Sequence, residues 1–222
     1  MLKYLVIMAA LALGCTTIED IDSTKRDTKD TVEEKSACVC PGQEEERQED
    51  LLPYFNQYDN ALHPGSSCQN TSIAMVLGKF GWRGTPDDIT REWGKDYAQS
   101  PGGLANVFNE VAARSGINKT ITPITNGTLE EFRSLLRQGK PTIVHGYFTG
   151  YGHVLVATGY DGQYYTVNDP AGCWTETFGG GYNWCPSGET GEGIRYRKAE
   201  FEAAIATSDG WSSLPLWFHR LN

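Results

Sequence analysis

The chain has 222 residues, which suits one well-buried domain rather than two full-sized ones. Charged residues make up 21% and hydrophobic residues 39%, which is a globular rather than a disordered composition. Lys and Arg together number 19 against 28 Asp and Glu, for a net charge of -9, and no basic cluster longer than a pair stands out. Because a nucleic-acid binder needs a basic face to displace counterions from phosphate, the sequence excludes that class.

The first fourteen residues are typical of an export signal. Lys3 precedes an apolar run over residues 4–13, which is far shorter than the roughly 20 residues that a membrane-spanning helix needs. The run ends in LALGC at residues 11–15, which resembles the lipobox of bacterial lipoproteins. That resemblance implies that residues 1–14 are a signal peptide and that Cys15 is acylated, which would anchor the protein to a membrane of the cell envelope. An ordinary secretory signal with an incidental cysteine is the alternative.

The next segment is expected to be an acidic tether. Residues 16–50 hold twelve acidic and five basic residues and few apolar ones. Such a segment cannot bury enough surface to offset the entropy of ordering it, and its like charges keep it extended. We therefore expect residues 15–50 to link the lipid anchor to a folded domain at residues 51–222.

The six cysteines fit an oxidising compartment. If Cys15 is acylated and Cys68 is a nucleophile, four cysteines remain, which is an even number for disulfides. We favour a disulfide between Cys173 and Cys185, because it would close a glycine-rich loop. Cys38 and Cys40 either pair with each other or tie the tether to the domain. A zinc site is the alternative, but a Cys-x-Cys pair with distant cysteines is a poor ligand spacing, so we expect neither a metal nor a cofactor.

The domain begins with helices. Apolar residues recur at the spacing i, i+3, i+4, i+7 from Ile73 to Phe80, after Ser66 or Ser67 as the capping residue. Capping residues, early acids and terminal glycines mark three more. These signals predict helices at 67–79, 86–97, 104–115 and 128–138. Cys68 lies in the first turn of the first helix.

The second half of the domain changes to strands. Apolar and β-branched residues predict strands at 141–148, 153–160, 163–168, 194–197 and 214–221, with a helix at 199–206. Asp161-Gly162 is a strong hairpin turn between two of them, and residues 171–193 are expected to form a loop. Helices followed by an antiparallel sheet predict the α+β class, with the N-terminal helices packed on the sheet.

A cysteine at the start of a helix is a candidate nucleophile. The helix N-terminus favours the thiolate form of Cys68, and a thiolate that attacks an acyl group needs a histidine as its base. His153 begins the strand that leads through the hairpin turn to Asn168 and Asp169. Because antiparallel strands place the start of one beside the end of the next, His153 and Asp169 are expected to be neighbours. Asn168 is the rival partner for the imidazole.

Five blocks of sequence carry a resemblance to a known family. They are LPYFNQYDN at 52–60, CQNTSIAMVL at 68–77, KPTIV at 140–144, GHVLV at 152–156 and VNDP at 167–170. In this order they resemble the bacteriocin-processing (double-glycine) peptidase-like branch of the papain-like cysteine peptidases, over roughly residues 51–218. The resemblance implies a papain-like fold.

The same resemblance implies the roles of the site residues. Cys68 would be the nucleophile, His153 the base and Asp169 the residue that orients the imidazole. Gln57 resembles the glutamine whose amide helps to form the oxyanion hole. Gln69 is a second candidate for that donor, because many relatives have Gly-Pro after the cysteine where this chain has Gln-Asn.

The leading hypothesis is an exported, membrane-anchored cysteine peptidase that hydrolyses peptide bonds through a thioester acyl-enzyme. Its partners would be a peptide or protein substrate and the membrane that holds its anchor. A non-catalytic peptide- or partner-binding lipoprotein and a cell-wall peptide amidase or acyl transferase are the alternatives. The aromatic residues of the loop form either a small core around the disulfide or a lid over the substrate: Trp174, Phe178, Tyr182 and Trp184. The remaining histidines are expected to be structural: His63, His145 and His219.

Overall fold

The computed structural model describes residues 51–206 and 215–222. The predictions of a signal peptide at 1–14, a lipidated Cys15 and an acidic tether to residue 50 lie outside the described residues. So do the two cysteines of the tether, Cys38 and Cys40. Within the described part of the chain, no helix is both long and apolar enough to cross a membrane.

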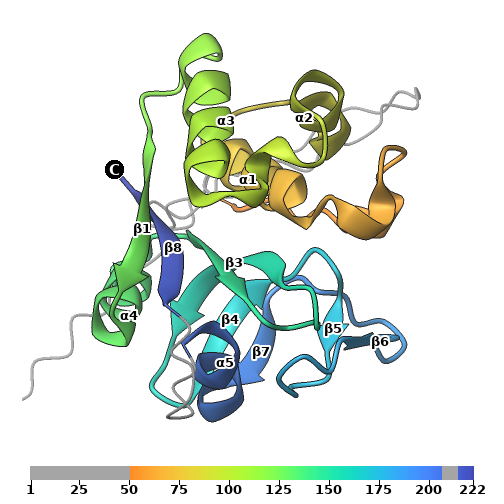
Figure 1. Cartoon of the computed structure of the whole chain (residues 1–222), viewed down its shortest axis with the longest axis vertical. Coiled ribbons are helices and arrows are strands. Elements are labelled where there is room, and N and C mark those ends of the chain that lie inside the picture. Colours follow the sequence, from red (N-terminus) through yellow and green to blue (C-terminus); the bar gives the residue numbers. More distant parts are fainter. Residues whose placement is uncertain (1–50, 207–214) are drawn as a thin grey trace, which may run out of the picture. The chain divides into compact units, whose positions relative to one another are not determined.

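A six-stranded antiparallel sheet forms the centre of the domain, in the order β1-β8-β2-β3-β4-β7 (Figure 1). A second sheet pairs β5 with β6. The strands are β1 Ile121–Gly127, β2 Thr142–Gly146, β3 His153–Tyr160, β4 Tyr164–Asn168, β5 Cys173–Trp174, β6 Tyr182–Asn183, β7 Ile194–Arg197 and β8 Leu216–Leu221.

Helices cover both faces of the large sheet. Consecutive side chains of a strand point to opposite faces, and β3 shows this directly. Val154 and Val156 pack in a core with α1 and α3, whereas Leu155 and Ala157 pack in a second core with α4 and α5. The α-helices are α1 Cys68–Lys79, α2 Pro86–Trp93, α3 Pro101–Arg114, α4 Leu129–Arg137 and α5 Lys198–Ile205. Single 3₁₀ turns lie at Gln57–Asp59, Pro64–Ser66 and Tyr97–Gln99. The predicted α+β class is therefore confirmed.

The helix ends depart from prediction in three places. The second helix stops at Trp93 instead of residue 97, because Gly94 has a φ of 73° and a 3₁₀ turn follows. The third starts at Pro101 rather than 104, since the Ser100 side chain accepts from the N–H of Gly103 and caps it. Ser67 precedes α1, but its hydroxyl makes no cap and accepts a hydrogen bond from Asn60 instead.

The strand β1 was not predicted from the sequence. Its seven residues contain Pro123, which has no N–H to donate to a sheet. In the structure β1 is an edge strand that pairs with β8 on one side, and an edge strand tolerates proline. The last strand, β8, therefore pairs with β1 on one side and with β2 on the other, which fixes the C-terminal residues in the sheet.

The predicted loop at 171–193 has internal order. Its short strands β5 and β6 pair Trp174 with Tyr182, and the predicted disulfide between Cys173 and Cys185 is present, with 5.1 Å between the Cα atoms. The aromatic residues do not form a single group. Trp174 is buried, whereas Trp184 is fully exposed.

Candidate active site

Helix α1 places Cys68 at the sheet. Its middle is fully buried, from Ile73 to Leu77, so the helix is fixed against β3 by core packing. The Ser72 hydroxyl also donates to the backbone oxygen of Val154 at 3.2 Å. Cys68 is the first residue of α1 and is a free thiol. The helix that begins with the cysteine therefore lies directly on the strand that begins with the histidine.

His153 and Asp169 meet as predicted across the β3–β4 hairpin. The His153 Nε2 atom lies 2.9 Å from Asp169 Oδ1, and both side chains are buried. Asn168 is turned elsewhere, because its Oδ1 accepts from the N–H of Gly193 at 2.9 Å. Of the two rival partners, it is Asp169 that contacts the imidazole.

A glycine is required just before the histidine. Gly152 has a φ of 84°, in the left-handed region that disfavours other residues. A Cβ atom at this position would lie 2.6 Å from Nε2 of His145. The Gly152-His153 pair is therefore explained by a tight turn whose backbone lies close to the imidazole of His145.

The Asp169 carboxylate is held by donors on both oxygens. Oδ1 accepts from His153 and from the N–H of Ala171 at 3.0 Å, and Oδ2 accepts from the hydroxyls of Tyr182 at 2.9 Å and Tyr196 at 3.0 Å. An ionised carboxylate only accepts hydrogen bonds, so four donors suit that form. Tyr196 is a site residue that the sequence does not predict, because no motif or periodicity marks it. Its position on β7, beside β4, brings it to the carboxylate.

The cysteine and the histidine favour a thiolate–imidazolium pair. Burial by itself raises the pKa of the Cys68 thiol, but the charge and hydrogen bond of His153 outweigh it and lower that pKa below its ordinary value. Burial would lower the pKa of His153, yet Asp169 and Cys68 together raise it to about 10. Since Nε2 faces Asp169, the other ring nitrogen, Nδ1, is the one left for the thiolate.

Gln57 keeps a free donor for an oxyanion and Gln69 does not. The Gln57 Nε2 group donates to the backbone oxygen of Pro64 at 3.0 Å, which leaves its second N–H unused among the described residues. Both N–H bonds of the Gln69 amide are taken, by the backbone oxygens of Ser66 at 3.1 Å and of Lys95. The N–H of Cys68, at the first position of α1, has no partner within its helix and is a second donor beside the thiol.

Among the described residues, the other three histidines make no hydrogen bond to the His153–Asp169 pair, although His145 lines the same cavity as His153. His219 is buried on β8, with Nε2 2.9 Å from the backbone oxygen of Pro101, and His63 is exposed. His145 is half-buried on β2 and stacks on Trp217, with ring centroids 4.5 Å apart. Burial, and to a lesser extent the neighbouring charge of His153, lower the pKa of His145 to about 4. His145 is therefore neutral near pH 7.

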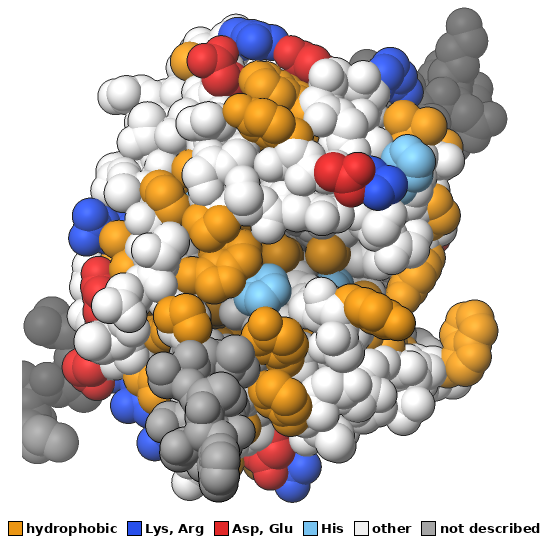
Figure 2. Space-filling model, viewed as in Figure 1, with side chains coloured by type: hydrophobic (Ala, Val, Ile, Leu, Met, Phe, Trp, Pro, Cys, Tyr) orange, Lys and Arg blue, Asp and Glu red, His pale blue; other side chains and the backbone are white. Residues whose placement is uncertain are grey.

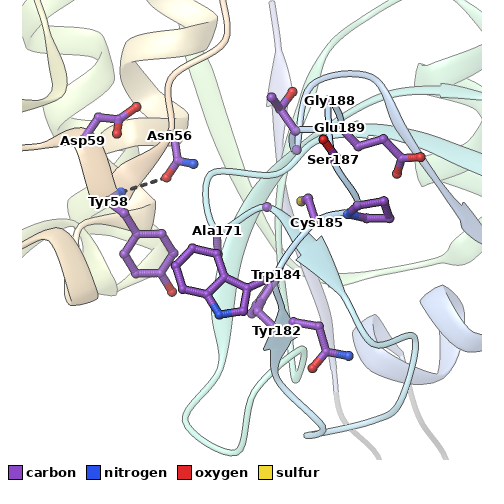
Figure 3. A pocket seen from close by; sticks show the side chains of 15 residues that line it. Asn56, Tyr58, Asp59, Ala171, Tyr182, Trp184, Cys185, Ser187, Gly188 and Glu189 are labelled. Atoms are coloured by element: carbon purple, nitrogen blue, oxygen red, sulfur yellow. Dashed lines mark hydrogen bonds between the residues drawn. The ribbon is translucent and has the colours of Figure 1, made fainter.

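Cys68, His153 and Gln57 line a cavity of about 430 Å³. Histidine side chains are visible in a hollow surrounded by apolar side chains on the face shown in Figure 2. A second cavity of about 770 Å³ adjoins it, because Tyr58, Ala171 and Tyr182 line both. Figure 3 shows this second cavity, with Tyr58 from the N-terminal segment and Trp184 from the disulfide loop among its walls. A chain longer than a few residues can therefore extend from the thiol along the disulfide loop.

The described residues contain no cluster of side chains suited to bind a metal ion. In residues 51–206 and 215–222, no group of three histidine, cysteine, aspartate or glutamate side chains could hold a metal ion. The arrangement offers a nucleophile, an acid–base pair and oxyanion donors.

Among the solved structures that resemble this chain, one C39-like peptidase shows the same fold. A C39-like peptidase from Bacillus anthracis is 15% identical, with a TM-score of 0.51, and the match covers 77% of this chain and 94% of that one. A double glycine motif protease from an AMS/PCAT transporter, solved with its leader peptide, is 17% identical, with a TM-score of 0.47 and coverage of 79% and 94%. The peptidase domain of Streptococcus ComA, a bi-functional ABC transporter of a quorum-sensing pathway, is 14% identical, with a TM-score of 0.49 and coverage of 77% and 98%.

No curated protein matches this sequence. The model of the Peptidase_C39 like family matches residues 50–203, which is well over half of the chain. The fold is the predicted papain-like α+β fold, with helices packed on an antiparallel sheet. The chain belongs to the Peptidase_C39 like family.

Proposed function

We propose that this chain is an active cysteine peptidase that hydrolyses peptide bonds through a triad of Cys68, His153 and Asp169. The single observation that carries the proposal is the buried His153–Asp169 hydrogen bond of 2.9 Å, at the end of the strand on which the cysteine-bearing helix packs. Membership of a peptidase family supports the reaction class.

The first half of the reaction forms a thioester. The Cys68 thiolate attacks the carbonyl carbon of the scissile bond, and the negative charge moves to the carbonyl oxygen. The N–H groups of Gln57 and Cys68 stabilise that oxyanion. The His153 imidazolium gives its proton to the leaving nitrogen, the C–N bond breaks, and an amine departs.

The second half of the reaction uses water. The neutral imidazole of His153 takes a proton from a water molecule, whose oxygen attacks the thioester carbon. The C–S bond then breaks, the thiolate returns and a carboxylic acid leaves. The balance is one amide and one water converted to one acid and one amine. Asp169 holds the imidazole in one orientation and stabilises its charged form in both halves.

The two adjoining cavities favour an extended peptide as the substrate. The thiol lies in the smaller cavity, and the larger one continues along the disulfide loop to the exposed ring of Trp184. An amidase or acyl transferase on the same fold would use the same triad. A binding protein would leave the thiol unreactive.

A peptide-library digest read by mass spectrometry tests this proposal. The wild-type chain should produce new peptide ends, whereas Cys68→Ala should produce none. An activity-based thiol probe should label Cys68 and lose that labelling in His153→Ala, while His63→Ala, at an exposed histidine, should keep it. A thiol that stays inert in the wild type would contradict the triad, and products carrying an added amine in place of water would identify a transferase.

We also propose that the protein is exported and lipid-anchored through Cys15. The lipobox-like sequence supports this, and so does the Cys173–Cys185 disulfide, because disulfides persist in oxidising compartments. Cells fed a clickable fatty acid should label the wild-type protein and not Cys15→Ala, which should leave the membrane fraction. Equal labelling and equal membrane retention of the two would refute the anchor.

A further inference from the structure

Tyr182 lies against the His153–Asp169 pair and lines both cavities. Its hydroxyl donates to Asp169 Oδ2 at 2.9 Å, and its ring centroid lies 5.1 Å from that of His153, with 62° between the ring planes. The same residue lines the catalytic cavity and the adjoining one. Tyr182 therefore contacts the buried hydrogen-bonded pair and also forms part of the wall of both cavities.

The hydroxyl of Tyr182 is committed to the carboxylate more fully than that of Tyr196. Tyr196 lies 3.0 Å from Asp169 Oδ2 and also 3.0 Å from the backbone oxygen of Gly172. A phenol carries one proton, so Tyr196 shares it between two acceptors. For Tyr182, Asp169 is the acceptor that the structure shows among the described residues. Tyr182 is therefore the stronger determinant of where Oδ2 sits.

Tyr182 is carried by a short strand that needs support. On its N-terminal side, the N–H of Gly181 donates to the backbone oxygen of Phe148 at 2.9 Å. On its C-terminal side, residues 183–190 are exposed apart from Cys185, which the disulfide joins to Cys173. Because two-residue strands are not stable by themselves, that covalent link holds β6 against β5.

The strand opposite Tyr182 is firmly anchored. Trp174 pairs with Tyr182 in the small sheet, is buried, and donates from Nε1 to the backbone oxygen of Phe148 at 3.0 Å. Its backbone N–H donates to the hydroxyl of Tyr196 at 3.1 Å. The disulfide thus connects the exposed segment after Tyr182 to a fixed part of the core.

We propose that Tyr182 is a positioning residue of the triad, which orients the Asp169 carboxylate toward His153, and that the Cys173–Cys185 disulfide keeps it in place. The proposal rests on the proposed peptidase function for its effect on turnover. Its effect on the reactivity of the Cys68 thiol needs no turnover and can be measured without a substrate.

The first test replaces Tyr182 by phenylalanine in the full chain, which removes the hydroxyl and keeps the ring. We expect kcat to fall roughly ten-fold, with KM nearly unchanged. A factor of about ten corresponds to the loss of one hydrogen bond to a charged group. A less oriented carboxylate stabilises the imidazolium less, and the imidazolium then stabilises the thiolate less. Alkylation of Cys68 by iodoacetamide, followed site by site with mass spectrometry, should therefore shift to higher pH.

A matched control is available on the β3–β4 hairpin that joins His153 to Asp169. The hydroxyl of Tyr160 donates to the backbone oxygen of Gly162 at 3.2 Å, at the far end from the triad. Tyr160→Phe makes the same chemical change and should leave both kcat and the alkylation profile of Cys68 as in the wild type.

The second test removes the disulfide with Cys173→Ser and Cys185→Ser together. In the wild-type background we expect the same upward shift of the Cys68 alkylation profile. In the Tyr182→Phe background the shift should be smaller, because the hydroxyl that the disulfide positions is already gone. Circular dichroism checks that the double variant folds, and Tyr182→Phe decides the positioning role if it does not.

The outcomes separate this proposal from the proposed function. A Tyr182→Phe chain with wild-type kcat and alkylation profile would overturn the positioning role while leaving peptide hydrolysis intact. A wild-type chain that cleaves no peptide, yet whose Cys68 reactivity depends on the Tyr182 hydroxyl, would overturn the function and support the positioning. A disulfide-free chain with the wild-type profile would overturn the part assigned to the disulfide.

Discussion

At the scale of residues, the charge on Asp169 organises the site. The carboxylate is fully buried and receives four hydrogen bonds, one of them from His153. A buried charge is tolerated only when it is paired and hydrogen-bonded. The same arrangement that stabilises the carboxylate therefore fixes the imidazole and raises its pKa, and the imidazolium in turn favours the Cys68 thiolate.

Replacing Asp169 by asparagine tests this chain of effects. The amide oxygen can still accept from His153, but the negative charge is lost, so the pKa of His153 should fall and that of Cys68 should rise. We expect kcat/KM to fall by roughly 100-fold to 10⁴-fold, because the corresponding Asp-to-Asn change in a serine-peptidase triad lowers kcat about 10⁴-fold with the geometry intact. Steady-state kinetics and the alkylation profile of Cys68 measure both effects.

The control for that substitution is Asp161→Asn. Asp161 is exposed in the turn of the same hairpin, where its Oδ1 accepts from the N–H groups of Gln163 and Tyr164, and asparagine can do the same. Its kinetics should match the wild type. A loss of equal size in both variants would assign the effect to the hairpin rather than to the charge.

Gln57 provides a second prediction at this scale. Removing one oxyanion donor typically lowers kcat by about 100-fold to 1,000-fold. Gln57→Ala should therefore lower kcat by about 100-fold with little change in KM. Gln99 lines the same cavity from a 3₁₀ turn and bonds to Asp96, so Gln99→Ala should keep kcat near the wild-type value. A Gln57→Ala chain that loses affinity and keeps kcat would make this residue a substrate contact instead.

How much of the site the sequence could predict depends on how local the contacts are. His153 and Asp169 are joined by one hairpin, so their pairing follows from strand alternation and a turn signal. Tyr182 and Tyr196 reach the same carboxylate from a loop and from the strand β7, and no spacing rule links them to Asp169. Only the assembled sheet brings these hydroxyls together.

At the scale of elements, periodic segments were predictable and edges were not. The helix α1 and the strand β3 carry strong apolar patterns, because each is buried along most of its length. The strand β1 lies at an edge, contains Pro123 and is largely half-exposed, so it lacks the alternation that marks a strand. Its existence depends on pairing with β8, nearly 100 residues later in the chain, which no local signal encodes.

The disulfide loop leads to the prediction at this scale. The disulfide closes a loop of 12 residues in sequence separation and so restricts the unfolded chain. Loops of about this length contribute about 2–3 kcal/mol in the chain-entropy model. The Cys173→Ser and Cys185→Ser chain should lose about that much unfolding free energy in urea titrations. A chain with unchanged stability would show that the loop is held by its backbone contacts alone.

At the scale of the whole molecule, the site lies where separate parts of the fold meet. Cys68 comes with the helices of one core, and Asp169 follows a strand whose Val167 packs in the other. The central strand β3 has side chains in both cores, and His153 is its first residue. The geometry of the site therefore depends on the packing of both faces of the sheet.

The pH dependence of global stability gives the last prediction. The pKa of His145 falls to about 4 in the folded chain, mainly through burial, against about 6.5 in an unfolded one. Between these values the unfolded chain binds more protons, so stability should fall as the pH drops from about 6.5 towards 4. The pKa of His153 is raised in the folded chain, so its stabilising contribution is complete below about pH 6.5. That contribution therefore does not change across this window.

Replacing His145 by phenylalanine removes the titrating group and keeps a ring against Trp217. Between pH 7 and pH 5 the wild type should lose about 1–2 kcal/mol of unfolding free energy through His145, a range reduced for its partial exposure. The loss of unfolding free energy in the variant should be smaller by that amount, because phenylalanine at position 145 binds no proton when the chain unfolds. His219 is buried with a lowered pKa and keeps part of the acid sensitivity in both chains, so the difference between their urea-unfolding curves isolates His145. Parallel curves for the two chains would mean that the imidazole is protonated in the folded state, in conflict with its position beside the charged His153.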